Sequence, residues 1–250
     1  MQKTRFIDHV DAPFDGATNM SIDQAIAESV AAGGLPALRL YRWREPTLSI
    51  GYFQSVGSRT DHVSSLSLPM VRRATGGGAI IHDHDLTYSF CTRLAKNQLG
   101  ANSQVYQSFH SCAIAALGTL QCTVETHGSL DSLLRGDEKN FLCFERRAGM
   151  DLEFRGYKVL GSAQRRVGQA ILQHGSLLLS GSPFAPSLPG IEDLIGKKLD
   201  WQRFCQCFAE QISRSISLSL VSDVLSGAER GRADVISQER FRNNSWNQRR

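Results

Sequence analysis

The sequence lacks the features that would mark a membrane or secreted protein. No apolar run approaches the ~18 residues that a bilayer-spanning helix needs. The first fifteen residues contain Arg5, Asp8 and Asp11, and no apolar stretch typical of a secretory signal. We therefore expect a cytoplasmic protein with no membrane partner.

Cysteine pairs and metal-binding patterns are also missing. The six cysteines, at positions 91, 112, 122, 143, 205 and 207, form no Cys-x-x-Cys pair. Without a secretion signal disulfides are not expected, and most of these cysteines are expected to be small buried side chains. His82 and His84 could share one face of a strand, but no third ligand is visible, so we expect no metal.

The charge is too weakly biased to indicate a nucleic-acid partner. The formal net charge is +4, and no long block of lysine or arginine occurs. The short basic pairs, such as Arg72-Arg73, Arg165-Arg166 and Arg249-Arg250, are scattered along the sequence. Such pairs are usually solvated surface, and we expect no nucleic-acid binding.

The 250 residues suffice for one large domain or two small ones. No linker rich in proline, glycine or serine divides them, and residues 181–190 are the weakest candidate for a boundary. We expect a single domain over residues 1–250, with a core at about 19–218 and a C-terminal tail at about 219–250.

Hydrophobic periodicity predicts the order of the elements. Helices are expected at 19–32, 104–120 and 199–217, the first capped by Asn19 or Ser21. Strands are expected at 38–43, 47–52, 70–73, 79–81, 86–92, 159–164 and 170–179, the last two paired around a turn at 167–168. This order is not a regular β-α alternation, so it predicts an α+β fold with a mixed, mainly antiparallel sheet flanked by helices.

The first candidate for chemistry is the glycine-rich segment Arg72-Arg73-Ala74-Thr75-Gly76-Gly77-Gly78. Three adjacent glycines are costly in backbone entropy, so the chain must need them. A bare backbone lets a ligand approach and offers N–H donors, while the arginines could attract a carboxylate, a phosphate or a thioester carbonyl. The alternative is a plain hairpin turn. No Gly-Lys-Ser/Thr follows, so the segment is not a P-loop.

The second candidate is Lys158-Val159-Leu160-Gly161-Ser162-Ala163-Gln164, followed by Leu172-Gln173-His174-Gly175-Ser176. The small residues of Gly161–Ala163 leave room beside a strand, which is typical of a pocket wall and also of tight sheet packing. His174 could line such a pocket, or it could be a hydrogen-bonded structural histidine.

In this order, the two segments resemble the biotin/lipoate ligase and lipoate-attachment superfamily, with its Arg-Arg-x-Ser/Thr-Gly-Gly-Gly, His-Asp and Lys-x-x-Gly-Ser-Ala motifs. The resemblance spans about residues 19–179 and implies one catalytic domain of that type. It implies that Lys158 lies against a reacting acyl carbonyl. It also implies an acyl-binding site at Arg73, Thr75, Gly76, Gly77, Gly78, His82, Gly161, Ser162, Ala163, His174 and Gly175.

Phe141-Leu142-Cys143-Phe144-Glu145, fifteen residues before Lys158, resembles the Cys-Phe segment of the cysteine-dependent octanoyltransferases. That branch implies that Cys143 forms an acyl-thioester and that Lys158 stabilises its thiolate. This chain departs from the pattern at Leu142, where proline is usual, and at Arg146-Arg147, where Pro-Ser is common. From composition alone, Cys143 would be a structural cysteine.

The resemblance therefore predicts transfer of octanoyl from octanoyl-acyl carrier protein to a lysine of a lipoyl domain, as in glycine cleavage H protein or 2-oxoacid dehydrogenase E2. Thioester exchange is nearly isoenergetic and amide formation runs downhill, so no cofactor is expected. The alternatives are a lipoate–protein ligase that needs ATP and Mg, an amidotransferase between lipoyl domains, and a catalytically inactive acyl-binding module.

Overall fold

The computed structural model describes residues 1–93, 101–127 and 140–250. The strands are β1 (Gln2–Phe14), β2 (Ala37–Trp43), β3 (Thr47–Ile50), β4 (Met70–Arg72), β5 (Ile80–His82), β6 (Asp85–Arg93), β7 (Glu125–Thr126), β8 (Leu152–Phe154), β9 (Tyr157–Val167), β10 (Ala170–Leu178) and β11 (Leu218–Ser222). The α-helices are α1 (Gly16–Ala31), α2 (Ala101–Thr119), α3 (Ile191–Ile195), α4 (Trp201–Ser215), α5 (Gly227–Ile236) and α6 (Asn244–Asn247). Short 3-10 turns lie at η1 (Gly57–Asp61), η2 (Val63–Ser65) and η4 (Cys143–Glu145), and a π-turn, η5, at Ser237–Phe241.

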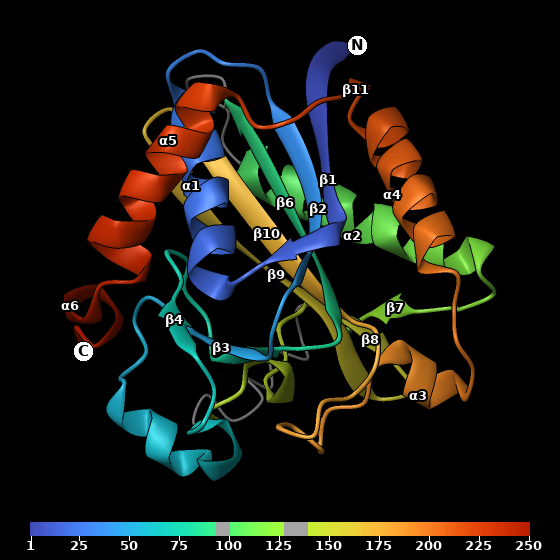
Figure 1. The fold of residues 1–250 in the computed structure, drawn as a ribbon. Coiled ribbons are helices and arrows are strands. Elements are labelled where there is room, and N and C mark those ends of the chain that lie inside the picture. Colours follow the sequence, from blue (N-terminus) through green and yellow to red (C-terminus); the bar gives the residue numbers. More distant parts are fainter. Residues whose placement is uncertain (94–100, 128–139) are drawn as a thin grey trace.

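The main sheet has the strand order β11-β1-β2-β6-β10-β9-β8-β7 (Figure 1). Its β11-β1 and β1-β2 pairs are parallel, and the remaining pairs are antiparallel. β9 and β10 form a hairpin that turns at Gly168, whose φ of +56° suits glycine. The α+β class and the mixed, mainly antiparallel sheet predicted from the sequence are confirmed.

Helices cover both faces of this sheet because successive strand residues point to opposite sides. On one face, α2 and α4 pack on apolar strand residues such as Leu38 and Phe90. On the other face, α1 and α5 pack together over residues such as Tyr41 and Leu172 (Figure 1). No helix in the described ranges is long and apolar enough to cross a bilayer.

A second, three-stranded sheet has the order β4-β3-β5 and carries its own apolar cluster. β3 pairs in parallel with β4 and antiparallel with β5. Since β4 and β5 flank β3 and do not pair with each other, the glycine segment between them is not a hairpin turn. The interpretation of the triple glycine as a plain hairpin turn is therefore wrong.

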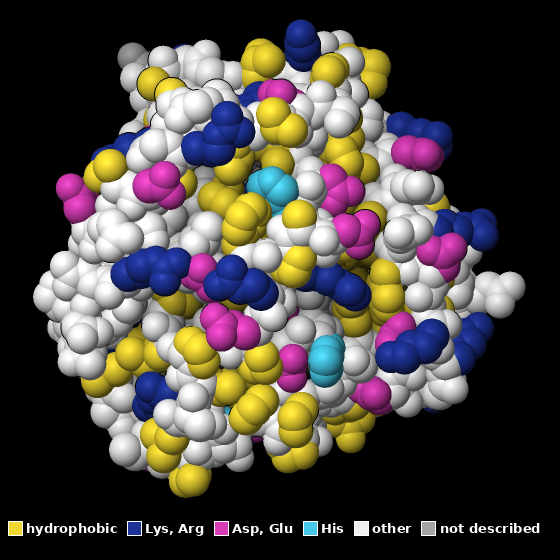
Figure 2. Space-filling model, viewed as in Figure 1, with side chains coloured by type: hydrophobic (Ala, Val, Ile, Leu, Met, Phe, Trp, Pro, Cys, Tyr) yellow, Lys and Arg dark blue, Asp and Glu magenta, His cyan; other side chains and the backbone are white. Residues whose placement is uncertain are grey.

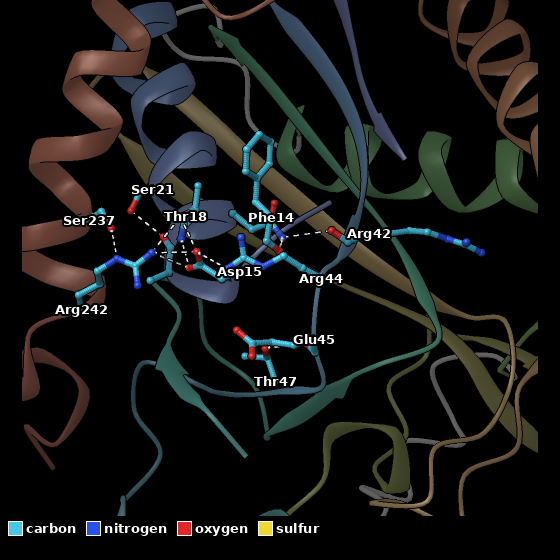
Figure 3. Close-up of polar contacts among 12 residues, drawn as sticks. Phe14, Asp15, Thr18, Ser21, Arg42, Arg44, Glu45, Thr47, Ser237 and Arg242 are labelled. Carbon is cyan, nitrogen blue, oxygen red and sulfur yellow. Dashed lines mark hydrogen bonds and ion pairs between the residues drawn. The ribbon is translucent and has the colours of Figure 1, made fainter. Parts of the chain in front are cut away.

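Charges of both signs are interspersed on the face seen in Figure 2, where Lys and Arg side chains lie next to Asp and Glu. Figure 3 shows one such group at the start of α1. Asp15 caps the helix by accepting from the backbone N–H of Thr18 at 3.0 Å, and it also pairs with Arg44 and Arg242. The predicted caps, Asn19 and Ser21, are wrong: both side chains are buried inside α1.

Two segments outside the predicted core complete the fold. β1 had not been predicted as a strand, because its alternation includes charged residues. The predicted C-terminal tail contains most of β11, α5, η5 and α6. β11 pairs with β1, α5 packs on α1, and the Asn247 amide oxygen accepts from the backbone N–H of Arg72 at 2.8 Å. The C-terminal residues thus contact the start of the glycine segment.

A candidate active site between the two sheets

A cavity of about 290 Å³ opens between the main sheet and the small sheet. That volume is close to the lower end of the range for small-molecule sites. Most of the predicted site residues line it: Arg73, Gly76, Gly77, His82, Cys143, Gly161, Ser162, Ala163, His174 and Gly175. Aromatic and aliphatic side chains such as Trp43, Ile80 and Phe144 provide much of the remaining wall. The cavity is therefore suited to an apolar chain with a few polar contacts.

Small residues on β9 and β10 create the floor of the cavity. A Cβ atom on Gly175 would lie 2.4 Å from Ser162 Oγ and 2.5 Å from the Tyr88 ring. A Cβ atom on Gly161 would lie 2.6 Å from Lys158 Cε. A side chain at Gly175 would displace Ser162 or Tyr88, and one at Gly161 would displace the end of the Lys158 side chain.

The triple glycine allows the loop of Cys143 to pack on the small sheet. Gly77 has φ +95°, and its Cβ atom would lie 3.0 Å from Arg73 Nη2. A Cβ atom on Gly78 would lie 3.0 Å from the backbone nitrogen of Cys143. The same backbone nitrogen donates to the Ala79 carbonyl at 2.7 Å. The glycines thus set the position of the cysteine.

The departures from the octanoyltransferase pattern are accommodated in this loop. Leu142 has φ −82° and ψ 135°, an extended conformation close to that of proline. Arg146 Nε donates to the Asn140 carbonyl at 2.6 Å, and Arg147 Nη1 donates to the Phe144 carbonyl at 3.1 Å. Both arginines therefore bind loop carbonyls on either side of Cys143.

Lys158 lies behind Cys143, away from the cavity lining. Its Nζ is 3.7 Å from Cys143 Sγ and 3.3 Å from the Cys143 carbonyl oxygen. It also forms an ion pair of 2.8 Å with Asp151, and both side chains are almost fully buried. Burial raises the pKa of Asp151, and the ammonium of Lys158 opposes that effect. The ammonium is thus held between a carboxylate and the thiol.

Arg73 is fully buried beside the same loop. Its Nη2 donates to the carbonyls of Gly76 and Gly78 at 2.8 and 2.6 Å, and its Nη1 donates to Ser49. Burial lowers its pKa to about 10, and the charge of Arg146 acts in the same direction. Among the described residues its Nε has no partner. Nη2 of Arg73 therefore holds the glycine loop, Nη1 holds Ser49 of β3, and Nε stays available.

His82 and His174 are both buried, each with a fixed partner. His82 Nδ1 is 2.7 Å from Asp85 Oδ2, and its ring stacks on Trp43. His174 Nε2 is 2.7 Å from Thr75 Oγ1, which explains why Thr75 lies outside the cavity lining. Burial lowers the pKa of His174 to about 4.

His82 and His84 were the two histidines that could have shared one face of a strand, as the ligands of a metal would. In the structure they have different surroundings. His84 is more than half exposed, in the turn between β5 and β6, whereas His82 is buried. Within residues 1–93, 101–127 and 140–250, no group of three His, Cys, Asp or Glu side chains has an arrangement that could hold a metal ion.

A directed chain of hydrogen bonds ends at Ser162 in the cavity wall. His110 Nδ1 lies 2.5 Å from the Met150 carbonyl, which can only accept, so Nδ1 carries the proton and Nε2 accepts. Ser162 Oγ therefore donates to Nε2 at 2.7 Å and accepts from the Tyr88 hydroxyl at 2.7 Å. Burial lowers the pKa of His110 to about 4, so its ring is neutral at pH 7. Ser162 thus offers the cavity an acceptor and no free proton.

Asp151 and His110 were not predicted from the sequence. Asp151 belongs to no recognised segment, and His110 lies within an otherwise ordinary amphipathic helix pattern. Only their proximity in space to Lys158 and Ser162 reveals them. A carboxylate seven residues before a candidate lysine was the one available signal for Asp151.

The sequence is similar to proteins of a known family. The model of the lipoyl protein ligase A/B catalytic domain matches residues 15–188. The chain is 31% identical to an octanoyltransferase LipM of Symbiobacterium thermophilum, over 94% of this chain and 95% of that protein. It is 28% identical to an octanoyltransferase LipM of Carboxydothermus hydrogenoformans, over 98% of both chains.

The fold also has a close counterpart among solved structures. A putative lipoate protein ligase from T. acidophilum, Ta0514, with bound lipoic acid superposes with a TM-score of 0.78 at 19% identity, over 99% of both chains. At that identity the likeness concerns the fold alone. The family model covers well over half of the sequence, and this chain belongs to the lipoyl protein ligase A/B catalytic domain family.

Proposed function

We propose that this chain is an octanoyltransferase that moves an octanoyl group from acyl carrier protein to a lysine of a lipoyl domain, through a thioester on Cys143. The octanoyltransferase activity is supported by relatives of that name that match nearly the whole chain. The observation that carries the mechanism is the distance of 3.7 Å between Lys158 Nζ and Cys143 Sγ, with Cys143 in the wall of an apolar cavity.

The first step is a thioester exchange. The Cys143 thiolate attacks the acyl carbonyl carbon, the new C–S bond forms, and the bond to the phosphopantetheine sulfur breaks. The leaving thiolate takes up a proton and departs as a thiol. The ammonium of Lys158, 3.7 Å from Sγ, favours the attacking thiolate by direct Coulomb attraction.

In the second step the acceptor lysine attacks as a neutral amine. An amide bond forms, the C–S bond to Cys143 breaks, and the thiolate is regenerated while the amine nitrogen loses its proton. A thioester is higher in energy than an amide, so the reaction needs no nucleotide. Ser162 can accept a hydrogen bond from the incoming amine, because its own proton is committed to His110.

Arg73 is the buried donor suited to the developing oxyanion. Its Nε is unpartnered among the described residues, and Arg73 lines the cavity together with Cys143. Gly76, Gly77, Ala163 and Gly175 then bound the acyl chain without filling its space. We propose that the acceptor is a lipoyl domain such as glycine cleavage H protein or that of a 2-oxoacid dehydrogenase E2 subunit.

The deciding experiment is intact-mass analysis after mixing the protein with octanoyl-acyl carrier protein, without nucleotide. One octanoyl adduct that hydroxylamine removes is expected, followed by transfer to an added lipoyl domain. Transfer from free octanoate or lipoate that requires Mg-ATP, with none from the thioester, would instead identify a ligase. An octanoylated lipoyl domain as the more efficient donor would identify an amidotransferase.

A further inference from the structure

Arg165 and three arginines from much later in the sequence meet on three aromatic rings beside the cavity. We call this group the arginine surface: Arg165, Arg240, Arg249 and Arg250, with Tyr52, Phe53 and Trp246. Arg249 lies over both Tyr52 and Trp246, with its Cζ 4.1 and 4.4 Å from the ring centroids. The same distance from guanidinium Cζ to ring centroid is 5.0 Å for Arg165 and Tyr52. It is 3.6 Å for Arg240 and Trp246 and 5.3 Å for Arg250 and Phe53. The rings hold the guanidinium groups in place.

The arginine surface carries an excess of positive charge, although the Glu28 carboxylate acts on Arg240 without forming an ion pair with it. Elsewhere arginines pair with carboxylates, as Arg44 and Arg242 do with Asp15 in Figure 3. In the part of the chain that the structure describes, no ion pair joins a carboxylate to any of the four arginines. Burial lowers the pKa of Arg240 to about 10, and repulsion from Arg165 and Arg249 adds to that shift.

The arginine surface borders the entrance of the cavity. Gly76 lines the cavity, and the Phe53 ring lies 3.7 Å from where its Cβ would be, while Phe53 itself is 70% exposed. Arg165 directly follows Gln164, another lining residue, and donates to the Ala74 carbonyl at 2.6 Å. A protein that rests on this surface would therefore have an apolar contact at the rim and a short path to Cys143.

A smaller recess of about 160 Å³ lies beside the cavity and is rich in arginine. Arg165, Arg166 and Arg240 line it, together with Asp23, whose carboxylate is paired with Arg39. The recess shares Met20 and His174 with the larger cavity. Planar guanidinium groups bind phosphate oxygens in pairs, and two of these arginines also belong to the arginine surface. The recess therefore suits a partner that carries a phosphate on the same arm as its acyl group.

We propose that the arginine surface docks an acidic carrier protein that presents its acyl thioester on a phosphopantetheine arm, with the phosphodiester in the arginine-lined recess. This inference rests on the proposed function and names the surface that its donor uses. The donor is favoured over the acceptor because a carrier lysine brings no phosphate to the recess. Opposite charge steers such encounters and raises the association rate, an effect that salt screens.

The test compares three donors in one transfer assay: octanoyl-acyl carrier protein, octanoyl-phosphopantetheine and octanoyl-pantetheine. Arg249→Glu/Arg250→Glu reverses two charges of the arginine surface outside the cavity. The matched control, Arg203→Glu/Arg214→Glu, makes the same change of net charge on exposed positions of α4. With the carrier protein at low salt, kcat/KM of the Arg249/Arg250 variant should fall ~10-fold or more through KM, and high salt should shrink the loss. With octanoyl-pantetheine it should match wild type.

Arg166→Ala tests the recess separately. It should raise KM for octanoyl-phosphopantetheine and leave KM for octanoyl-pantetheine unchanged. Equal KM increases for both small donors would refute the phosphate assignment. An equal loss in the control double variant, or no loss with the carrier protein, would refute the docking surface.

A binding measurement separates this proposal from the proposed function. Fluorescence anisotropy of labelled acyl carrier protein and of a labelled lipoyl domain needs no chemistry. Weaker binding of the acyl carrier protein to the Arg249/Arg250 variant supports the docking surface even if Cys143 proves not to be the nucleophile. Weakened binding of the lipoyl domain alone would assign the surface to the acceptor and overturn the proposal.

Discussion

Cys91 and Cys143 have the same side chain but very different surroundings. Cys91 is 1% exposed between α1 and the main sheet, where burial and the nearby Asp23 carboxylate raise the pKa of its thiol well above the usual value. Cys143 is half-buried in the wall of the cavity, with the Lys158 ammonium 3.7 Å away. Because the thiolate is the reactive form of cysteine, these surroundings favour Cys143 over Cys91 as the nucleophile of the proposed reaction.

The polar groups around the two cysteines also differ in how many of their hydrogen bonds are already made. Asp23, next to Cys91, accepts from Arg39, Tyr41 and Ser89 at 2.7 to 2.8 Å, so its buried charge is fully matched. Around the cavity, polar capacity is left over at Arg73 Nε and on the acceptor side of Ser162. The polar groups around Cys91 all bind one another, whereas some of those around the cavity can still form a hydrogen bond with a ligand.

The largest effect is expected from replacing Cys143 with serine, and the replacement of Cys91 with serine is its control. Cys143→Ser should abolish the hydroxylamine-labile adduct and lower transfer by at least ~10³-fold, as loss of a covalent nucleophile does. Cys91→Ser should keep the adduct, because Cys91 does not reach the cavity. Intact mass before and after hydroxylamine measures both. An adduct that persists in Cys143→Ser would remove Cys143 from the mechanism.

Removing the charge beside Cys143 should have the next largest effect. Lys158→Met should slow alkylation of Cys143 by iodoacetamide at pH 7 and reduce transfer by ~10²-fold or more, as loss of an electrostatic group in an acyl-transfer site does. It also leaves Asp151 unpaired, which typically costs about 3–5 kcal/mol of stability for a buried pair.

The double variant Lys158→Met/Asp151→Asn is the control for that loss of stability. It removes both charges, so it should regain much of the thermal stability without regaining activity. Recovery of activity together with stability would mean that Lys158 only supports the fold. Lys158→Arg should restore alkylation better than transfer, because its donors are placed differently.

A smaller effect is expected at the glycine loop. Gly77→Val places a branched side chain at φ +95°, 3.0 Å from Arg73 Nη2 and 3.9 Å from Cys143 Sγ. We expect transfer to fall by on the order of 10- to 100-fold through displacement of the cysteine. Circular dichroism checks that the fold survives, and the alkylation rate of Cys143 reports whether the cysteine has been displaced. Wild-type transfer at equal fold content would contradict the role given to the loop.

The smallest effect concerns stability against pH. The pKa of His110 is about 4 in the folded protein and about 6.5 when exposed, so between these values the unfolded state binds more protons. The contribution of His110 to the free energy of unfolding should therefore rise with pH across this window. That contribution is lost as the pH falls towards 4. His110→Gln should reduce the slope by up to ~1.4 kcal/mol per pH unit. Parallel urea-denaturation profiles for the two proteins would show that His110 does not titrate in this way.

Local patterns predicted much of the fold because periodicity reports burial directly. The β9–β10 hairpin and the helix that contains Phe208 follow from alternating or helical apolar spacing, and both are confirmed. β1 escaped prediction because one of its faces is charged and partly exposed. The Asp15 cap escaped because the apolar pattern of α1 begins several residues after its true start.

The candidate site was predictable only where its residues belong to a recognisable segment. Cys143, Lys158 and the glycines stand in motifs, whereas Asp151 and His110 gain meaning only from long-range contacts. The arginine surface shows the same limit: Arg165 and Arg249 are 84 residues apart in sequence and meet over one tyrosine. Their separate basic pairs looked like ordinary solvated surface.

The contact between Arg72 and Asn247 also bears on the order in which the protein matures. Arg72 precedes the glycine loop by a few residues, and its backbone N–H and its Nε bind Asn247, 175 positions later. The Trp246 indole donates to the Arg72 carbonyl at 2.8 Å. The segment before the glycine loop can therefore gain these hydrogen bonds only after residue 247 has been synthesised, so its last contacts form late during translation.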